Sequence, residues 1–338
     1  MDERHTFPVG KLPPEMLDHW LATVPIKDQR VLLGPKLGED AAVIDFGDRV
    51  LIAKTDPITF TAERIGWYAV HINANDVATM GARPRWFLAT VLLPENQTDA
   101  HLVESIFRDL ILTCESLGIT LCGGHTEITY GLNRPMVIGQ MLGEVSKDKL
   151  IVKSRLQADD QIILTKGVAI EGTAIIAREK AEVLKDHFND RQLERAKNYL
   201  TDPGISVVVD ALIANDAAEI HAMHDPTEGG LIAGLWELAV AAQVGLLIHA
   251  DRIPILPETR AVCQIFHLDP LRLIASGALL IAVPPQACHQ VLTALHQNNI
   301  AAVIIGEARP RSEGTRLRLD EQWVDLLYPP QDEITRVL

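Results

Sequence analysis

Apolar residues recur along the chain with two periods, one typical of helices and one typical of strands. Residues 86–93 read W-F-L-A-T-V-L-L, an apolar run that predicts a strand at 85–93. Residues 100–117 instead place Leu102, Ile106 and Leu110 at helical spacing. By the same criteria, the first half should hold helices at 15–23, 65–80 and 100–117, and strands at 49–54, 85–93, 119–122 and 136–145.

The second half repeats this outline of strands, helices and glycine-containing loops. We expect strands at 161–165, 244–249, 278–283 and 302–306, and helices at 172–182, 185–199, 206–215, 230–242, 258–266 and 285–298. Strands that alternate with helices predict an α/β fold, although the amphipathic strands also fit an α+β fold. The pattern alone does not separate these two classes.

A polar stretch at 146–160 separates the two halves. The chain has 338 residues, which is too long for one ordinary hydrophobic core. We therefore expect two domains, at residues 1–153 and 154–338.

Composition and charge narrow the classes of partner. The formal net charge is −14 and no basic run is present, so we expect no nucleic-acid partner. No stretch of about 18 apolar residues occurs, and residues 1–5 have no apolar signal core. We therefore expect a cytoplasmic protein with no membrane partner.

The four cysteines, Cys114, Cys122, Cys263 and Cys288, are scattered, and no C-x-x-C pair is present. This spacing disfavours zinc sites and dithiol redox chemistry. Because each cysteine has apolar neighbours, we expect all four to be small core residues.

Three acidic residues stand where one predicted element gives way to another. Asp40 precedes a β-like segment, Asp56 closes the strand at 49–54, and Asp76 lies in the helix at 65–80. Rigid elements could aim these carboxylates at one point, where mutual repulsion would favour a bound cation. Hard oxygen ligands suit Mg²⁺, which usually brings a phosphate group. Alternatively, Asp40 and Asp56 simply form turns.

The stretch C-G-G-H-T-E at 122–127 is a second candidate site. Two glycines after a strand would let backbone N–H groups approach an anion. Thr126 could add a hydroxyl group, and His125 or Glu127 a metal or proton contact. A plain turn at Gly123 and Gly124 is the alternative.

The stretch D-P-T-E-G-G at 225–230 precedes the predicted helix at 230–242. A helix N-terminus attracts anions, but Asp225 or Thr227 could equally be helix caps. His221 and His224 lie next to Asp225, although a loop pair without a third histidine is a weak zinc signal. Two further loops, at 165–173 and 275–278, match no phosphate-binding motif.

Other common catalytic motifs are absent from the sequence. It contains no G-x-S-x-G, no H-E-x-x-H and no Rossmann fingerprint. Serine-hydrolase, zinc-peptidase and nicotinamide-dependent chemistry therefore lose support.

Taken in order, these motifs resemble the AIR synthase (PurM) superfamily. They read G-E-D-A-A-V, K-T-D, N-D-V-A-T-M-G-A, G-G-H-T, T-K-G, D-P-T-E-G-G and S-G-A-L-L. Within the superfamily, the hydrogenase maturation proteins called HypE are the most similar. The resemblance implies two α/β domains and a homodimer in which the N-terminal domains share a β-barrel. It also implies that ATP and Mg²⁺ bind to the acidic motifs.

The resemblance further assigns individual roles. It implies metal binding by Asp40, Asp56 and Asp76, and catalytic roles for Asp56, Glu127 and Asp225. It implies a nucleotide site that contains Lys54, Asn75, Gly123, Gly124, Thr126, Glu228, Gly229 and Gly230.

Three departures from HypE bear on the reaction. HypE carries a carbamoyl group on a C-terminal cysteine, whereas this sequence ends I-T-R-V-L. HypE usually has lysine at the position of Glu127 and often has N-E-G where Ala275-Ser276-Gly277 stand here. Selenophosphate synthetase shares the G-G-H-T motif, but it has a reactive Cys or Sec near its N-terminus that this chain lacks.

We therefore predict Mg-ATP-dependent activation of a small-molecule oxygen or similar acceptor, with enzyme activity of the ligase or phosphotransferase type left open. We expect no carbamoyl transfer onto the chain itself. One alternative is a non-catalytic relative that binds nucleotide or a partner protein in hydrogenase maturation. Another is a phosphotransferase similar to selenophosphate synthetase.

Overall fold

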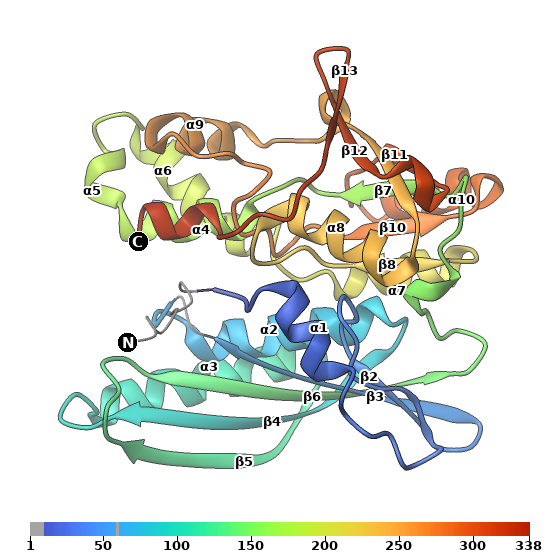
Figure 1. The fold of residues 1–338 in the computed structure, drawn as a ribbon. Coiled ribbons are helices and arrows are strands. Elements are labelled where there is room, and N and C mark those ends of the chain that lie inside the picture. Colours follow the sequence, from blue (N-terminus) through green and yellow to red (C-terminus); the bar gives the residue numbers. More distant parts are fainter. Residues whose placement is uncertain (1–9, 59–60) are drawn as a thin grey trace, which may run out of the picture.

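The computed structural model describes residues 10–58 and 61–338, which form two sheets with helices packed against them (Figure 1). The first half contains α1 (Pro14–Leu21), β1 (Val31–Leu33), β2 (Ala42–Asp45), β3 (Arg49–Ile58), α2 (Ile65–Thr79), β4 (Arg83–Pro94), α3 (Ala100–Leu117), β5 (Thr120–Thr129) and β6 (Met136–Ser146).

The first sheet has the strand order β1-β2-β3-β6-β4-β5. Its neighbours run antiparallel except β4 and β5, which are parallel and joined through α3. Helices α2 and α3 cover one face of this sheet (Figure 1). The parallel pair leaves β5 at the edge, with one of its sides unpaired in the chain.

The second half follows a short 3₁₀ turn at Lys153–Arg155. It contains β7 (Gln161–Thr165), α4 (Ile170–Glu179), α5 (Ala181–Leu184), α6 (Asp190–Lys197), α7 (Val208–Ala217), β8 (Ala222–His224), α8 (Gly230–Ala242), β9 (Gly245–His249), α9 (Pro257–Phe266), β10 (Leu280–Val283), α10 (Pro285–Gln297), β11 (Ala302–Arg309), β12 (Thr315–Leu319) and β13 (Gln322–Asp325). The strand order is β13-β12-β9-β11-β7-β10-β8. The β12–β13 hairpin projects from the body of the molecule (Figure 1).

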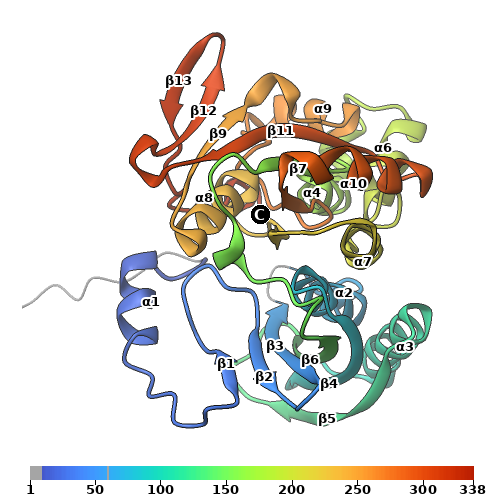
Figure 2. The same cartoon turned by 90° about the vertical axis from the view of Figure 1, so that its right-hand side faces the viewer.

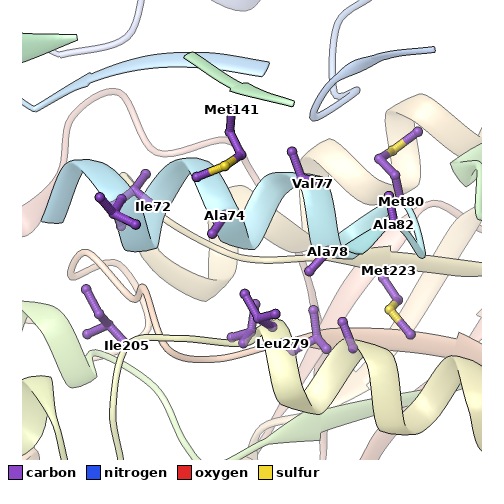
Figure 3. Close-up of a cluster of buried hydrophobic side chains, with 14 of the residues drawn as sticks. Ile72, Ala74, Val77, Ala78, Met80, Ala82, Met141, Ile205, Met223 and Leu279 are labelled. Carbon is purple, nitrogen blue, oxygen red and sulfur yellow. The ribbon is translucent and has the colours of Figure 1, made fainter. Parts of the chain in front are cut away.

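Helix α2 lies between the first sheet and the second half, and all fifteen of its residues are buried (Figure 2). Met141 of β6 packs on one side of the helix, and Ile205, Met223 and Leu279 of the second half pack on the other (Figure 3). Helix α2 also carries His71, Asn73, Asn75 and Asp76, so polar side chains are buried along it together with apolar ones. The two halves therefore share one core across α2.

Asn75 fastens α2 to the second half. Its Nδ2 donates to the carbonyl of Ile205 at 2.8 Å, and its Oδ1 accepts from the N–H of Val207 at 2.8 Å. Both polar atoms of the side chain are thus occupied by backbone groups, and Asn75 lines neither of the cavities described below.

Several predicted elements agree closely with the structure. The helix at 100–117 and the strand at 161–165 have the predicted bounds. Almost all strand pairs are antiparallel, so both sheets have the character of an α+β fold. The change from the first sheet to the second falls between Ser146 and Gln161.

The strand expected at 119–122 is present, but the end expected for it at Gly123-Gly124 is wrong. Strand β5 continues to Thr129, and Gly123 and Gly124 pair with Leu88 and Ala89 of β4. A Cβ at Gly124 would lie 1.9 Å from the carbonyl oxygen of Ala89, so this glycine permits close strand pairing. Strand β3 likewise runs two residues beyond Asp56.

Two expectations about burial are also wrong. Cys122 is exposed, because it lies on the edge strand β5, whereas the other three cysteines are buried. The solvated helix expected at 185–199 is shorter, and it buries Leu193 and Tyr199 against α4 and α9. Strands β1, β2, β8, β12 and β13 were not predicted as strands of defined length, and β8 lies where a loop was expected. In residues 10–58 and 61–338, no helix is long and apolar enough to cross a membrane.

We predict that Asn75→Ala lowers the free energy of unfolding of the nucleotide-free protein. The change leaves a buried N–H and a buried carbonyl unpaired, which costs about 1–3 kcal/mol per group. Urea unfolding in EDTA measures the loss, and Asn298→Ala serves as the control because the exposed Asn298 side chain donates only to the carbonyl of Ala294 in its own helix. Equal unfolding free energies for the two variants would contradict the assignment.

Candidate active site

The register of β3 directs two predicted site residues toward α2. Lys54 and Asp56 pair with Met141 and Gly139 of β6, and Met141 is buried against α2. Side chains two residues apart in a strand share one face, so Lys54 and Asp56 both point to the helix side. There Lys54 Nζ lies 3.2 Å from Asp56 Oδ2 and 3.4 Å from Asp76 Oδ2.

Asn73 fixes the backbone of Asp56. Its Oδ1 accepts from the N–H of Asp56 at 2.8 Å, and its Nδ2 donates to Ala69 at 2.9 Å. This contact requires glycine opposite: a Cβ at Gly139 would lie 2.4 Å from Nδ2 of Asn73. The helix and the strand are therefore locked together beside the carboxylate.

Asp40 belongs to a buried array of charges that joins the two halves. Its Oδ1 lies 2.7 Å from Lys153 Nζ and 2.9 Å from His224 Nδ1, and its Oδ2 accepts from the Thr79 hydroxyl at 3.0 Å. Burial alone would raise the pKa of Asp40, but Lys153 and His224 outweigh it and hold that pKa well below its usual range.

The array continues from His224 to Glu237. Nε2 of His224 lies 3.0 Å from Glu237 Oε2, and Lys11 Nζ donates to Glu237 Oε1 at 3.0 Å. Burial and Lys153 lower the pKa of His224, but Asp40 and Glu237 more than offset them, so that it is raised. These five side chains therefore satisfy one another's charge.

Asp225 differs from this array because neither of its oxygens has a hydrogen-bond partner in the described part of the chain. It is 2% exposed, and burial together with the charge of Asp40 raises its pKa to about 7. Burial raises the pKa of Asp76 as well, and the charge of Asp225 adds to the rise. One ligand atom from each of Asp40, His224 and Asp225 lies within 4.8 Å of the others.

The carboxylates next to this array, rather than the array itself, fit a divalent cation. Unpaired buried carboxylates are unfavourable unless a positive charge joins them, and Mg²⁺ prefers carboxylate oxygens. Asp76 and Asp225 have the free carboxylate character that a cation needs, with Asp56 beside them. Asp40 is already bonded on both oxygens, so it holds Lys153 and His224 in place.

A cavity of about 700 Å³ opens over these residues. Lys54, Asp56, Asp76 and Asp225 form its polar end, and Leu17, Trp236 and Tyr328 contribute apolar surface. This volume lies within the usual range for small-molecule sites. The cavity therefore offers carboxylates and a lysine at one end and an apolar wall elsewhere.

The structure does not bring every predicted residue to this cavity. Gly123, Gly124, Thr126 and Glu127 lie on the edge strand β5, and the side chain of Glu127 is exposed beside His125. Within one chain they do not line the cavity.

The glycines of the loop before α8 also have another role. The N–H of Gly229 donates to Asp332 Oδ2 at 2.6 Å, so it is not open to an anion. A Cβ at Gly230 would lie 2.6 Å from the carbonyl of Leu271. These glycines permit close packing, whereas Glu228 and Thr227 do line a cavity.

Sequence reasoning missed Lys11, Asn73, Lys153 and Glu237, and considered His224 only as a zinc ligand. Lys153 lies 113 residues from Asp40 and 71 residues from His224. No local spacing could signal such contacts. His221 is separate from the cluster, since its Nδ1 pairs with Asp160 at 2.8 Å.

Comparison with known proteins gives the family of this arrangement. Residues 38–145 match the AIR synthase related protein N-terminal domain, and residues 157–317 match the corresponding C-terminal domain. A putative hydrogenase expression/formation protein of Methanocaldococcus jannaschii is 27% identical over 339 residues, with 97% of each chain covered.

Solved structures agree with the sequence matches. The crystal structure of HypE, a hydrogenase maturation protein of E. coli, has a TM-score of 0.73 at 26% identity, covering 89% of this chain and 95% of that one. A HypE in complex with ATP has a TM-score of 0.68 at 22% identity, covering 92% and 91% of the two chains. The second likeness concerns the fold alone.

We predict that Asp225→Asn stabilises the metal-free protein at pH 8. Between the ordinary pKa of 3.8 and the folded value of about 7, the native carboxyl keeps a proton that the unfolded chain loses. The free energy of unfolding therefore falls as pH rises through this window. Each pKa unit is worth about 1.4 kcal/mol, so the variant should gain at most about 4 kcal/mol.

Urea unfolding in EDTA from pH 5 to pH 8 measures this gain, which should shrink toward pH 5. The exposed Asp186→Asn is the control. A wild-type protein as stable as the Asp225→Asn variant at pH 8 would show that Asp225 is not held as an unpaired carboxyl.

Proposed function

We propose that this chain, which belongs to the AIR synthase (PurM) superfamily, binds ATP with Mg²⁺ in the larger cavity and uses it to activate a small-molecule acceptor. The observation that carries the proposal is the unpartnered, buried Asp225 beside Asp76 and Asp56 at the polar end of that cavity. The HypE structure solved with ATP supports the choice of nucleotide.

Each residue of the cluster has a distinct part in this proposal. Asp76 and Asp225, with Asp56, would hold Mg²⁺, which neutralises phosphate charge when bound. Burial lowers the pKa of Lys54, but Asp76 and Asp56 more than offset this effect and raise it. Lys54 therefore stays charged and can face a phosphate oxygen. Phosphoryl transfer mainly requires such positioning and charge stabilisation.

Asp56 also lines a second, smaller cavity, and this gives the acceptor a place to bind. In the transfer, the bond from the γ-phosphorus to its bridging oxygen breaks, and ADP leaves. The acceptor oxygen forms the new bond to phosphorus, and its proton passes to a carboxylate such as Asp56. An enzyme of this kind needs no thiol carrier on its own chain.

The relative named as a hydrogenase expression/formation protein supports a second candidate function. In that case the chain binds nucleotide and a maturation partner without turnover. ADP formation from ATP, measured with and without small-molecule acceptors, separates the two functions, because a non-catalytic protein forms no ADP.

The proposal includes a homodimer, and the support for it is the apolar outer face of the first sheet. Trp86, Leu88, Ile138 and Leu142 lie on the face opposite α2, and Trp86 is 38% exposed. The strand β5 adds an open edge beside this face, since its outer side is unpaired within the described residues. A second copy would cover this apolar face and an open strand edge, which otherwise invite aggregation. The same contact would bring Glu127 of one copy toward the larger cavity of the other copy.

We predict that saturating Mg-ATP raises the free energy of unfolding by about 2.7 kcal/mol at 100 times its dissociation constant. Asp56→Asn and Asp76→Asn should each remove most of this gain, because each deletes one carboxylate of the proposed Mg²⁺ site. Thermal shift with ATP, in Mg²⁺ and in EDTA, measures the effect, with the exposed Asp216→Asn as the control. Full shifts in both site variants would refute the assignment.

We also predict a homodimer at micromolar concentration, measured by light scattering. Leu142→Glu should convert it to a monomer, because the charge falls in the middle of the apolar outer face. Leu319→Glu, on the exposed strand β12, should leave the dimer intact. A monomeric wild-type protein would sink this part of the proposal.

A further inference from the structure

A second cavity of about 490 Å³ adjoins the first, and the two share Lys11, Asp56 and Thr227. Its walls are largely apolar. The apolar part of the lining comes from both halves of the chain and consists of Pro57, Ile58, Ile72, Ile175 and Ile274. A space of this size and lining suits a small molecule rather than a macromolecule.

Two polar side chains in the wall of this cavity have atoms without partners. Glu171 is 5% exposed and Ser276 is fully buried, and both line the cavity. Within the described residues, neither Glu171 Oε2 nor Ser276 Oγ has a hydrogen-bond partner. Buried polar groups are normally paired, so such atoms indicate that a ligand completes the site.

The backbone holds these two side chains near each other. The N–H of Gly172 donates to the carbonyl of Ile274 at 3.1 Å, which brings the start of α4 against the stretch that carries Ser276. A Cβ at Gly172 would lie 2.5 Å from Leu273 Cγ, so only glycine allows this approach. The backbone segments that carry Glu171 and Ser276 are therefore held together in the fold.

The charges around the cavity are mostly negative. Glu171, Glu228 and Asp56 line it, while Lys11, the one cation among the described lining residues, is paired with Glu237 at 3.0 Å. Burial raises the pKa of Glu171 to about 7, although the side chain and the backbone of Ser276 approach its carboxylate as donors and oppose the rise, while Asp332 and Glu228 add to it. An anion would meet repulsion here, whereas a positive charge would relieve it.

We propose that the second cavity binds the acceptor of the proposed reaction, and that this acceptor is a small organic cation: an ammonium compound with a short apolar part and the hydroxyl oxygen that takes the phosphoryl group. Its N–H groups bond to Glu171, and its apolar part contacts the isoleucines. The Ser276 hydroxyl donates to an acceptor atom of the same molecule. The inference depends on the proposed function only in naming the occupant as the acceptor.

Three probes of similar size test the charge preference: ethylammonium, uncharged propanamide and anionic propionate. Affinities are measured by saturation-transfer NMR, with and without Mg-ATP. We expect ethylammonium to bind at least tenfold tighter than propionate. Equal or tighter binding of propionate, or no binding of ethylammonium, would overturn the proposal.

Variants locate the effect. Glu171→Gln should weaken ethylammonium binding about tenfold and leave propanamide binding nearly unchanged, and Glu228→Gln should weaken ethylammonium binding about threefold. The exposed Glu182→Gln is the matched control. Unchanged ethylammonium binding in both cavity variants would refute the role of these carboxylates.

Mg-ATP thermal shifts on the same proteins distinguish this proposal from the proposed function. Glu171→Gln should keep the full Mg-ATP shift, because Glu171 lies outside the metal cluster. A wild-type protein without that shift would refute ATP binding, while the probe affinities would still decide the cation site.

Discussion

The complete burial of helix α2 is the constraint on which the rest of the structure depends. Nδ1 of His71 has no partner among the described residues, but three other polar side chains of this buried helix find partners within the protein. Asn73 does so through β3, Asn75 through the 205–207 segment, and Asp76 through Lys54. Because these partners lie in three directions, the rotation of the helix about its axis is fixed, and with it the direction in which Asp76 points.

Two kinds of electrostatics meet at the end of this helix. In the array from Asp40 to Lys11, each charge has an opposite charge within hydrogen-bond distance, so it acts as a rigid wall. Beside it, Asp225 and Asp76 carry negative charge that the protein leaves only partly compensated. Lys153 and Lys11 are already paired within this array, so they are not available to neutralise Asp225. This contrast favours binding of a cation over collapse of the cavity.

Local patterns predicted a large part of this site but not its connections. Asp56 and Asp76 could be placed because one lies near the end of a strand and the other on a helix, and periodicity indicates both elements, although β3 continues to Ile58. The role of Lys153 could not be foreseen, since a polar linker sequence gives no sign that its lysine is 1% exposed. The Gly-Gly pair of β5 was expected either to face an anion or to form a turn, because the sequence does not reveal that a neighbouring strand passes too close for a side chain.

The acidic loop before α8 shows the same limit. Its position at a helix start was predicted correctly, and α8 begins at Gly230. What the glycines do there depends on Asp332, about a hundred residues away. Anion binding at a helix start requires free N–H groups, and whether they are free is a property of the tertiary structure.

The Asp40–Lys153–His224 contact also bears on how the molecule can be divided. Asp40 comes from the first half, His224 from the second, and Lys153 from the segment between them. Cutting the chain at this linker would leave each fragment with an unmatched buried charge and an exposed side of the shared core. Genes that encode the halves separately would therefore have to be expressed together, and the fragments would recover a working cavity only by reassociating.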